Sequence, residues 1–332
     1  MYYDDVSLRD LAAAKGAGQM LVNTIFTKLG APLSERKQQR LADGAEFLGL
    51  EHDVSQAFTT GEISFWPRAG LIDQIRDRIL EILESGVCTS NQANKLLGVL
   101  GFTATGMWSR VGRIGVGVLQ QRAHARVRTR AVDPMLVAVL DFFLVLLQAQ
   151  PRRVAPVLPP ALAPVVIASD AQADSSPTGG YLLIDTHSGE KVGACFDFGC
   201  AFLQAVGFAP EDLAAGGNPI AQCEAAAVVM AAIGEAHRLR ERDVLWFVDN
   251  TSALHCLVKG GARNAHLARS VHVLHLLSYH LRCRIWFEYV PSGQNWSDGV
   301  SRAGLRDPMG REAGLRSPQH GHVCLAMGGP SA

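Results

Sequence analysis

The sequence has no long hydrophobic run and no pattern of paired cysteines. Its most apolar segment, Met135 to Leu147, contains Asp141 and is too short to cross a bilayer, so it predicts a buried helix and no membrane partner. The seven cysteines form no CxxC pair, which indicates free thiols in a reducing compartment. No basic segment followed by an apolar core stands at the N-terminus, so no secretory signal is expected. These absences predict an intracellular protein, cytoplasmic or nuclear.

Acidic residues are also absent from Ser85 to Val132, although the whole chain has 31 acidic and 31 basic residues. The neutral total argues against a wholly basic nucleic-acid-binding protein, but this segment has a local positive field of the kind that binds phosphate. The alternative is a solvated helix face followed by a linker. The candidates for nucleic-acid contacts in this segment are Arg110, Arg113, Arg122 and Arg126.

The 332 residues are enough for two ordinary domains, and an apolar content of 48% predicts that most of the chain folds. Residues 1–84 mix short apolar runs with charged helices, and residues 85–150 are expected to be helical and basic. Five prolines between residues 151 and 164 predict an extended linker. Residues 165–302 alternate strands and helices. Residues 303–332, rich in Gly, Pro, Ser and Arg, are expected to form a disordered tail.

The alternation within 165–302 predicts an α/β fold. Three apolar runs read as consecutive strands, and an Ala-rich helix follows from Pro219 to about Leu239. A fourth strand, Val244 to Val248, is followed by two helices, a fifth strand from Arg284 to Val290, and a final helix that opens at Ser297. The order strand, strand, strand, helix, strand, helix, helix, strand, helix suits a mixed sheet flanked by helices.

Four carboxylates stand at informative places in this order. Asp170 follows the first strand, Glu224 lies in the Ala-rich helix, Asp249 ends the fourth strand, and Asp298 opens the last helix. Any one of them alone is most simply a cap or loop residue. An acid placed after a buried strand is costly unless it is paired or binds a metal, and Mg²⁺ prefers carboxylate oxygens. The set therefore predicts a site for two Mg²⁺ ions, with Mn²⁺ as an alternative, that supports phosphodiester cleavage.

The order Asp, Glu, Asp, Asp on strand, helix, strand and helix resembles the ribonuclease H family. The resemblance covers about 140 residues and is most specific to retroelement polyproteins, particularly those of DIRS-like retrotransposons. It implies a ribonuclease H-like fold in which Asp170, Glu224, Asp249 and Asp298 bind the metal and hydrolyse RNA in RNA–DNA hybrids. The strings that carry it are Ser169-Asp170-Ala171 before Gly179-Gly180, Val248-Asp249-Asn250-Thr251-Ser252-Ala253, and Val290-Pro291-Ser292-Gly293-Gln294-Asn295-Trp296-Ser297-Asp298-Gly299-Val300-Ser301-Arg302.

Two departures from the family concern this same region. The family often has a histidine before the last Asp, where it helps product release, whereas Tyr289 to Ser297 contains none. The segment Gly207 to Asn218 looks like an insertion between the first strands and the helix that carries Glu224. Both departures bear on the rate of catalysis more than on the fold.

The N-terminal part resembles the end of a reverse transcriptase. Tyr2-Tyr3-Asp4-Asp5 is similar to the catalytic hairpin of those enzymes, and the strings Gly30 to Ser34 and Phe47 to Leu50 are similar to the end of their palm. Residues 92–122 would be the thumb and connection. A polymerase also needs an upstream aspartate and the fingers, which this sequence does not contain. We therefore expect a truncated retrotransposon product that lacks polymerase activity by itself.

Three functions stay open at this point. An RNA–DNA hybrid endonuclease is the first, a catalytically inactive nucleic-acid-binding remnant the second, and a recombinase or integrase of the same superfamily the third and least favoured. Asn250 could position the substrate backbone or merely complete the turn after Asp249. Arg263 could contact phosphate, although a plain helix cap at Asn264 explains this loop equally well.

Overall fold

The computed structural model describes residues 14, 16–34, 44–47, 50–107, 110–125, 130–149, 152–157, 162–173, 177–198, 204, 218–308 and 311. The chain divides into two compact units, which are treated separately below. The first comprises Met1–Ser109 and Val118–Pro159, and the second Arg110–Gly117 and Pro160–Ala332. Within the described part of the chain, no helix is long and apolar enough to span a membrane.

The first unit contains a four-stranded antiparallel sheet and a group of helices. The strands follow the order β1 (Gly44–Phe47), β2 (Leu50–Asp53), β3 (Glu62–Pro67) and β4 (Arg153–Pro156) across the sheet. The helices are α1 (Ala17–Lys28), α2 (Ala69–Ser85), α3 (Ser90–Met107), α4 (Arg113–Ala123), which begins in the segment assigned to the second unit, and α5 (Pro134–Gln148). Helical structure over much of residues 85–150 agrees with the sequence pattern.

Helix α5 confirms the predicted buried helix. Asp133 caps its N-terminus by accepting a hydrogen bond from the Leu136 amide at 2.9 Å, and Pro134 occupies the first turn, where its missing N–H costs nothing. Leu140 and Phe143 are fully buried. The face of α5 that carries these two residues is therefore buried within the first unit.

The predicted linker over residues 151–164 requires a correction, because part of it is strand β4. Arg153, Val154 and Ala155 pair with β3, and Pro156 stands opposite Glu62 at the end of the ladder. Prolines are tolerated at the ends and edges of sheets, where no ladder N–H is required. The three residues without proline between Arg152 and Pro156 therefore suffice for an edge strand.

The second unit is built on a five-stranded mixed sheet, as the sequence predicted. Its strands are β5 (Val165–Gln172), β6 (Thr178–Asp185), β7 (Lys191–Asp197), β8 (Asp243–Val248) and β9 (Arg284–Tyr289), in the order β7-β6-β5-β8-β9. The pairs β5–β6 and β6–β7 are antiparallel, whereas β5–β8 and β8–β9 are parallel. The parallel pairing brings the carboxyl ends of β5 and β8 to the same edge of the sheet.

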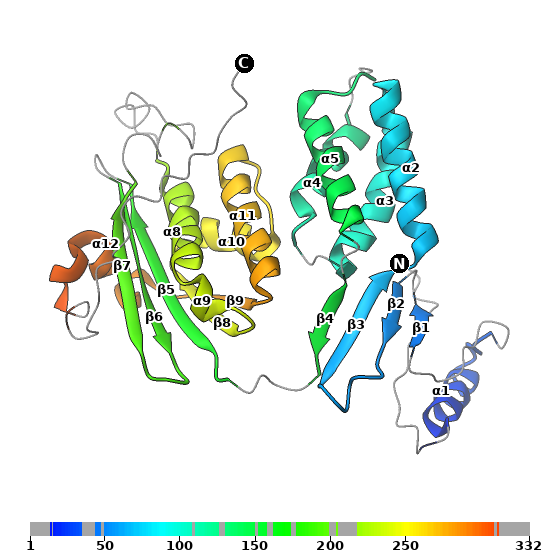
Figure 1. Cartoon of the computed structure of the whole chain (residues 1–332), viewed down its shortest axis with the longest axis horizontal. Coiled ribbons are helices and arrows are strands. Elements are labelled where there is room, and N and C mark those ends of the chain that lie inside the picture. The colour runs from blue at the N-terminus through cyan, green and yellow to red at the C-terminus, as the bar shows by residue number, and fades with distance from the viewer. Residues whose placement is uncertain are drawn as a thin grey trace. The chain divides into compact units, whose positions relative to one another are not determined.

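Helices cover both faces of this sheet (Figure 1). Helices α8 (Ile220–Gly234), α10 (Thr251–Lys259) and α11 (Ala265–Leu281) lie on one side, and α12 (Asp298–Ala303) packs against β5, β6 and β7 from the other side. Short helical segments complete the unit: α9 (Ala236–Leu239), η3 (Ser292–Gln294) and η4 (Gly304–Arg306). Since η4 lies beyond Arg302, the predicted tail has to begin later than residue 303, and residues 309–310 and 312–332 lie outside the described part.

The core of the second unit lies between the sheet and helices α8 and α11. Trp246 is fully buried there among Val165, Val228 and Leu274. Helix α8 consists largely of alanine and valine, so its backbone can approach the sheet closely while still burying apolar surface. This close approach sets Glu224, on the same helix, beside the carboxyl ends of β5 and β8.

Candidate metal centre

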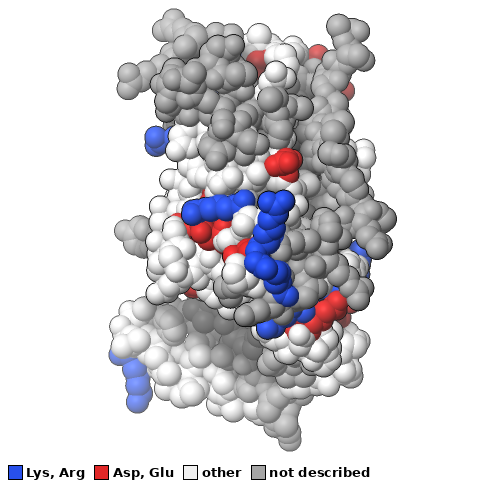
Figure 2. Space-filling view, turned by 90° about the vertical axis from the view of Figure 1, so that its left-hand side faces the viewer, with Lys and Arg blue, Asp and Glu red and all other residues white. Residues whose placement is uncertain are grey.

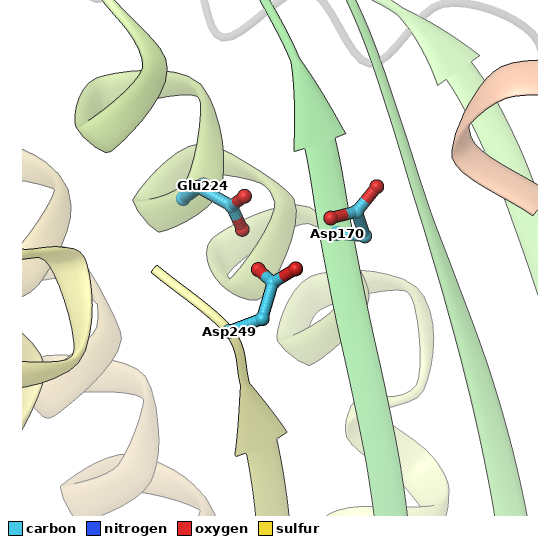
Figure 3. Close-up of side chains that lie close together, drawn as sticks. All are labelled: Asp170, Glu224 and Asp249. Atoms are coloured by element: carbon cyan, nitrogen blue, oxygen red, sulfur yellow. The ribbon is translucent and has the colours of Figure 1, made fainter. Parts of the chain in front are cut away.

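Three carboxylates converge at the edge of the sheet in the second unit (Figure 3). Asp170 comes from β5, Glu224 from α8, and Asp249 from the residue that follows β8. Each offers one oxygen, and these oxygens lie within 4.8 Å of one another. The side chains of the three residues point toward a common space, which is the arrangement that carboxylates adopt around a cation.

Burial makes this cluster electrostatically costly. Asp170 and Glu224 are only 4% and 2% exposed. Burial, and then the charges of Asp170 and Asp249, raise the pKa of Glu224 to about 9. Burial also raises the pKa of Asp170 to about 6, and the charges of Asp249 and Asp298 add to this rise against a hydrogen bond from Ser301. Without a cation, Glu224 is therefore protonated at neutral pH.

The Oε2 atom of Glu224 tests most directly whether these residues fit a cation. It is buried and has no hydrogen-bond partner. Native proteins seldom leave a buried polar atom unsatisfied, because the lost hydration costs free energy that nothing replaces. The donor set around it consists of carboxylate oxygens alone, which suits a hard divalent cation such as Mg²⁺ or Mn²⁺. The residues present therefore fit a divalent cation held by Asp170, Glu224 and Asp249.

Asp298, the fourth predicted residue, lies outside this group of three. It begins α12, its side chain is 27% exposed, and its Oδ1 lies 2.6 Å from Nη2 of Arg302 one turn later. Its charge nevertheless contributes to the raised pKa of both Asp170 and Glu224. The structure thus brings together three of the four acids. The fourth, Asp298, lies nearby, is more exposed than Asp170 and Glu224, and forms an ion pair.

A second set of polar residues supports the segment that carries Asp170. The Trp246 indole donates to Oγ of Ser169 at 3.0 Å, and the Asn295 side-chain amide donates to the main-chain oxygen of Ser169 at 3.3 Å. Ser301 donates a short hydrogen bond to Oδ2 of Asp170. Sequence reasoning missed Asn295 and Ser301 as site residues, although both lie within the final string that carries the family resemblance.

Asn250 and Arg263 occupy the connections around α10. Oδ1 of Asn250 accepts a hydrogen bond from the Ala253 amide at 3.0 Å, so this side chain caps α10. Arg263 is exposed in the loop before α11, and Asn264 caps that helix by accepting from the amides of His266 and Leu267. Asn250 completes the turn after Asp249, and Arg263 remains a candidate for phosphate contacts.

The basic residues predicted to bind nucleic acid differ in how their guanidinium groups are used. Within the second unit, Arg110 is partly buried, which lowers its pKa, and Arg113 is exposed and donates to the main-chain oxygen of Lys259 at 3.4 Å. In the first unit, Arg122 donates to the main-chain oxygens of Cys88 and Ala131, at 3.0 and 2.6 Å. Two N–H groups of Arg122 are therefore already used in hydrogen bonds to the main chain of the first unit.

The remaining predicted residues lie outside the described part of the chain: Arg126 and the residues of the resemblance to a polymerase hairpin, Tyr2, Tyr3, Asp4 and Asp5. On the face drawn in Figure 2, Lys and Arg side chains lie directly beside Asp and Glu side chains. Arg302, whose side chain is 61% exposed, forms an ion pair with Asp298.

Comparisons with known proteins find similarity among solved structures but not among sequences. No family model matches the sequence, and no curated protein matches it either. One similar solved structure, the N-terminal ribonuclease H domain of a Mycobacterium tuberculosis protein, has 13% identity, covers 45% of this chain and 97% of its own, and has a TM-score of 0.32. Ribonuclease H1 of Halobacterium salinarum NRC-1 has 18% identity, covers 44% of this chain and 99% of its own, and has the same TM-score of 0.32. At that TM-score, neither likeness supports a conclusion about function.

Proposed function

We propose that the second unit is a metal-dependent nuclease of the ribonuclease H type, which hydrolyses the RNA strand of RNA–DNA hybrids. The observation that carries this proposal is the buried Glu224, whose Oε2 has no partner and which faces Asp170 and Asp249 within 4.8 Å. The main-chain N–H of Ala171 donates to this carboxylate, whereas a purely structural acid would be expected to have a donor for its buried Oε2 as well. Three acids on a strand, a helix and a parallel strand, all aimed at one point, instead favour a cation site.

Asp170, Glu224 and Asp249 would hold the cation, with Asp298 as a fourth ligand once Arg302 releases its Oδ1. When bound, divalent cations lower the pKa of a water molecule and neutralise charge on a phosphodiester. The chain's own groups supply the geometry: β5 and α8 fix two carboxylates with almost no exposure, so their positions need little reorganisation. Arg302, once freed from Asp298, would be available for a phosphate oxygen of the substrate.

The preference for a hybrid rests on the resemblance to ribonuclease H domains of retroelements. Proteins distinguish RNA from DNA through the ribose 2′-hydroxyl and the shape of the duplex. A separate resemblance, that of the strings Gly30 to Ser34 and Phe47 to Leu50 to reverse transcriptases, is the basis for proposing that the first unit derives from the palm end and thumb of such an enzyme. An inactive nucleic-acid-binding remnant is the alternative, and activity is the property that separates the two.

The test uses the full chain and an end-labelled RNA–DNA hybrid, with Mg²⁺, with Mn²⁺, and with EDTA. Cleavage of the RNA strand that requires the cation, with duplex DNA left intact, is the expected result. Binding of the hybrid without cleavage under all conditions would favour the inactive remnant. Equal cleavage of duplex DNA would move the protein to the recombinase and integrase class.

A further inference from the structure

Ser301 contacts the proposed metal centre without being one of its acids. It lies in α12, is 2% exposed, and donates a short hydrogen bond from its hydroxyl to Oδ2 of Asp170. The same hydroxyl oxygen lies 2.9 Å from the main-chain oxygen of Asp298. A hydroxyl has one proton, and a carboxylate is the stronger acceptor of the two, so the proton goes to an ionised Asp170.

The fold fixes the backbone that carries Ser301. Oγ1 of Thr178 on β6 donates to the main-chain oxygen of Ser301 at 2.7 Å. Gly180 is the residue of β6 that pairs with Asp170, and a Cβ atom at this position would lie 2.9 Å from the Ser301 nitrogen. The glycine therefore permits α12 to rest on the strand next to Asp170, and Thr178 ties the helix there.

This arrangement leaves the two oxygens of Asp170 in different surroundings. In Figure 3, one oxygen of Asp170 points toward Glu224 and Asp249, and the other points away from them. Oδ2 accepts the hydrogen bond from Ser301, which lies on a different element from either of the other two acids. A carboxylate with one oxygen held by a hydroxyl cannot rotate freely, so the orientation of its second oxygen is set in advance.

We propose that Ser301 is a positioning residue, whose hydroxyl fixes the Asp170 carboxylate so that its free oxygen faces the cation site formed with Glu224 and Asp249. The role rests on the metal binding in the proposed function. Residues that orient metal ligands in this way typically change metal affinity or activity about 10–100-fold when they are removed. A serine that only helped to dock α12 on the sheet would instead change stability and leave metal affinity in place.

The test measures Mn²⁺ binding to the full chain directly, from the electron paramagnetic resonance signal of free Mn²⁺ during a titration. Ser301→Ala should weaken binding about 10–100-fold. Ser301→Cys keeps the side chain's size but provides a much weaker donor, so it should fold and still bind Mn²⁺ more weakly than the unmodified chain. Thr178→Val is the matched control: it removes the bond that docks α12, so it should lower the melting temperature while changing Mn²⁺ affinity by no more than about twofold.

Different results separate the two proposals. If the unmodified chain binds no Mn²⁺, the metal site itself is wrong and the role of Ser301 falls with it. If the unmodified chain binds Mn²⁺ and both Ser301 variants bind it within about twofold of that affinity, the positioning role is contradicted and the metal site stands. Weakening by Thr178→Val as large as that by Ser301→Ala would also contradict it, because docking of α12 would then explain the effect.

Discussion

Replacing Glu224 by glutamine should make the protein more stable when no cation is present. The pKa of Glu224 is raised from 4.5 to about 9 by burial and by the neighbouring acids. The folded state therefore holds this proton up to about pH 9, whereas the unfolded chain releases it above about pH 4.5, so stability falls as the pH rises between these values. The loss is about 1.4 kcal/mol per pH unit, or at most about 3.5 kcal/mol between pH 4.5 and pH 7. Glutamine stays neutral in both states and avoids this loss.

Urea unfolding in EDTA at several pH values measures the effect. Tryptophan fluorescence follows the unfolding, and three of the five tryptophans, the buried Trp246 among them, belong to the second unit. Glu224→Gln should raise the free energy of unfolding by less than about 1 kcal/mol at pH 5 and by about 1–3 kcal/mol at pH 7. Saturating Mg²⁺ should stabilise the unmodified chain and leave the variant unchanged, because the variant lacks a ligand. A variant that is destabilised at every pH, or whose effect does not depend on pH, would refute the electrostatic reasoning.

Three further substitutions test other parts of the second unit. Asp298→Asn should slow cleavage less than substitution of any acid in the group of three, because Asp298 is 27% exposed and already paired with Arg302; the rate constants under saturating Mg²⁺ decide this. Gly180→Ala should cost about 1–3 kcal/mol of stability, since its Cβ would press on the Ser301 backbone; a melting temperature equal to that of the unmodified chain would contradict the packing described. Asp185→Asn should lower the free energy of unfolding by about 1–2 kcal/mol above pH 4, and progressively less as the pH falls toward 2. The reason is that the hydrogen bond from Arg242 lowers the pKa of Asp185 to about 2. Denaturant titrations at pH 3 and pH 7 measure the difference.

The order of elements in the second unit could be predicted because its strands are short apolar runs between turn residues. Val165 to Ala168 and Val244 to Val248 have few polar residues, as strands covered on both faces do, and each is followed closely by an aspartate. Strand β4 could not be predicted because prolines surround it in the sequence. Its three residues without proline form a strand only by pairing with β3, which is distant in the chain. Local composition does not report such long-range pairing.

The acids of the candidate site could be proposed from sequence because a carboxylate on a buried strand is unusual by itself. The sequence could not show that three of these acids converge while Asp298 lies apart, because this depends on where α8 and α12 pack. The small residues of α8 let the helix pack close to the sheet, which brings Glu224 inward. Asp298 instead begins the short helix α12 and forms an ion pair with Arg302. The role of Ser301 could not be predicted, because a serine within a helix is common. Its importance depends on how closely α12 approaches β6 at Gly180, which only the structure reveals.

The most direct test of the metal-dependent nuclease is Asp249→Asn, compared with Asp243→Asn at the opposite end of the same strand. Asp249 is one of the three converging acids, and Asp243 pairs with the exposed Arg284. Both changes remove one negative charge and keep the side chain's size. We expect Asp249→Asn to lose cleavage of the hybrid by several orders of magnitude together with Mg²⁺-induced stabilisation, while Asp243→Asn keeps both. Cleavage and Mg²⁺-induced stabilisation that both survive Asp249→Asn would contradict it.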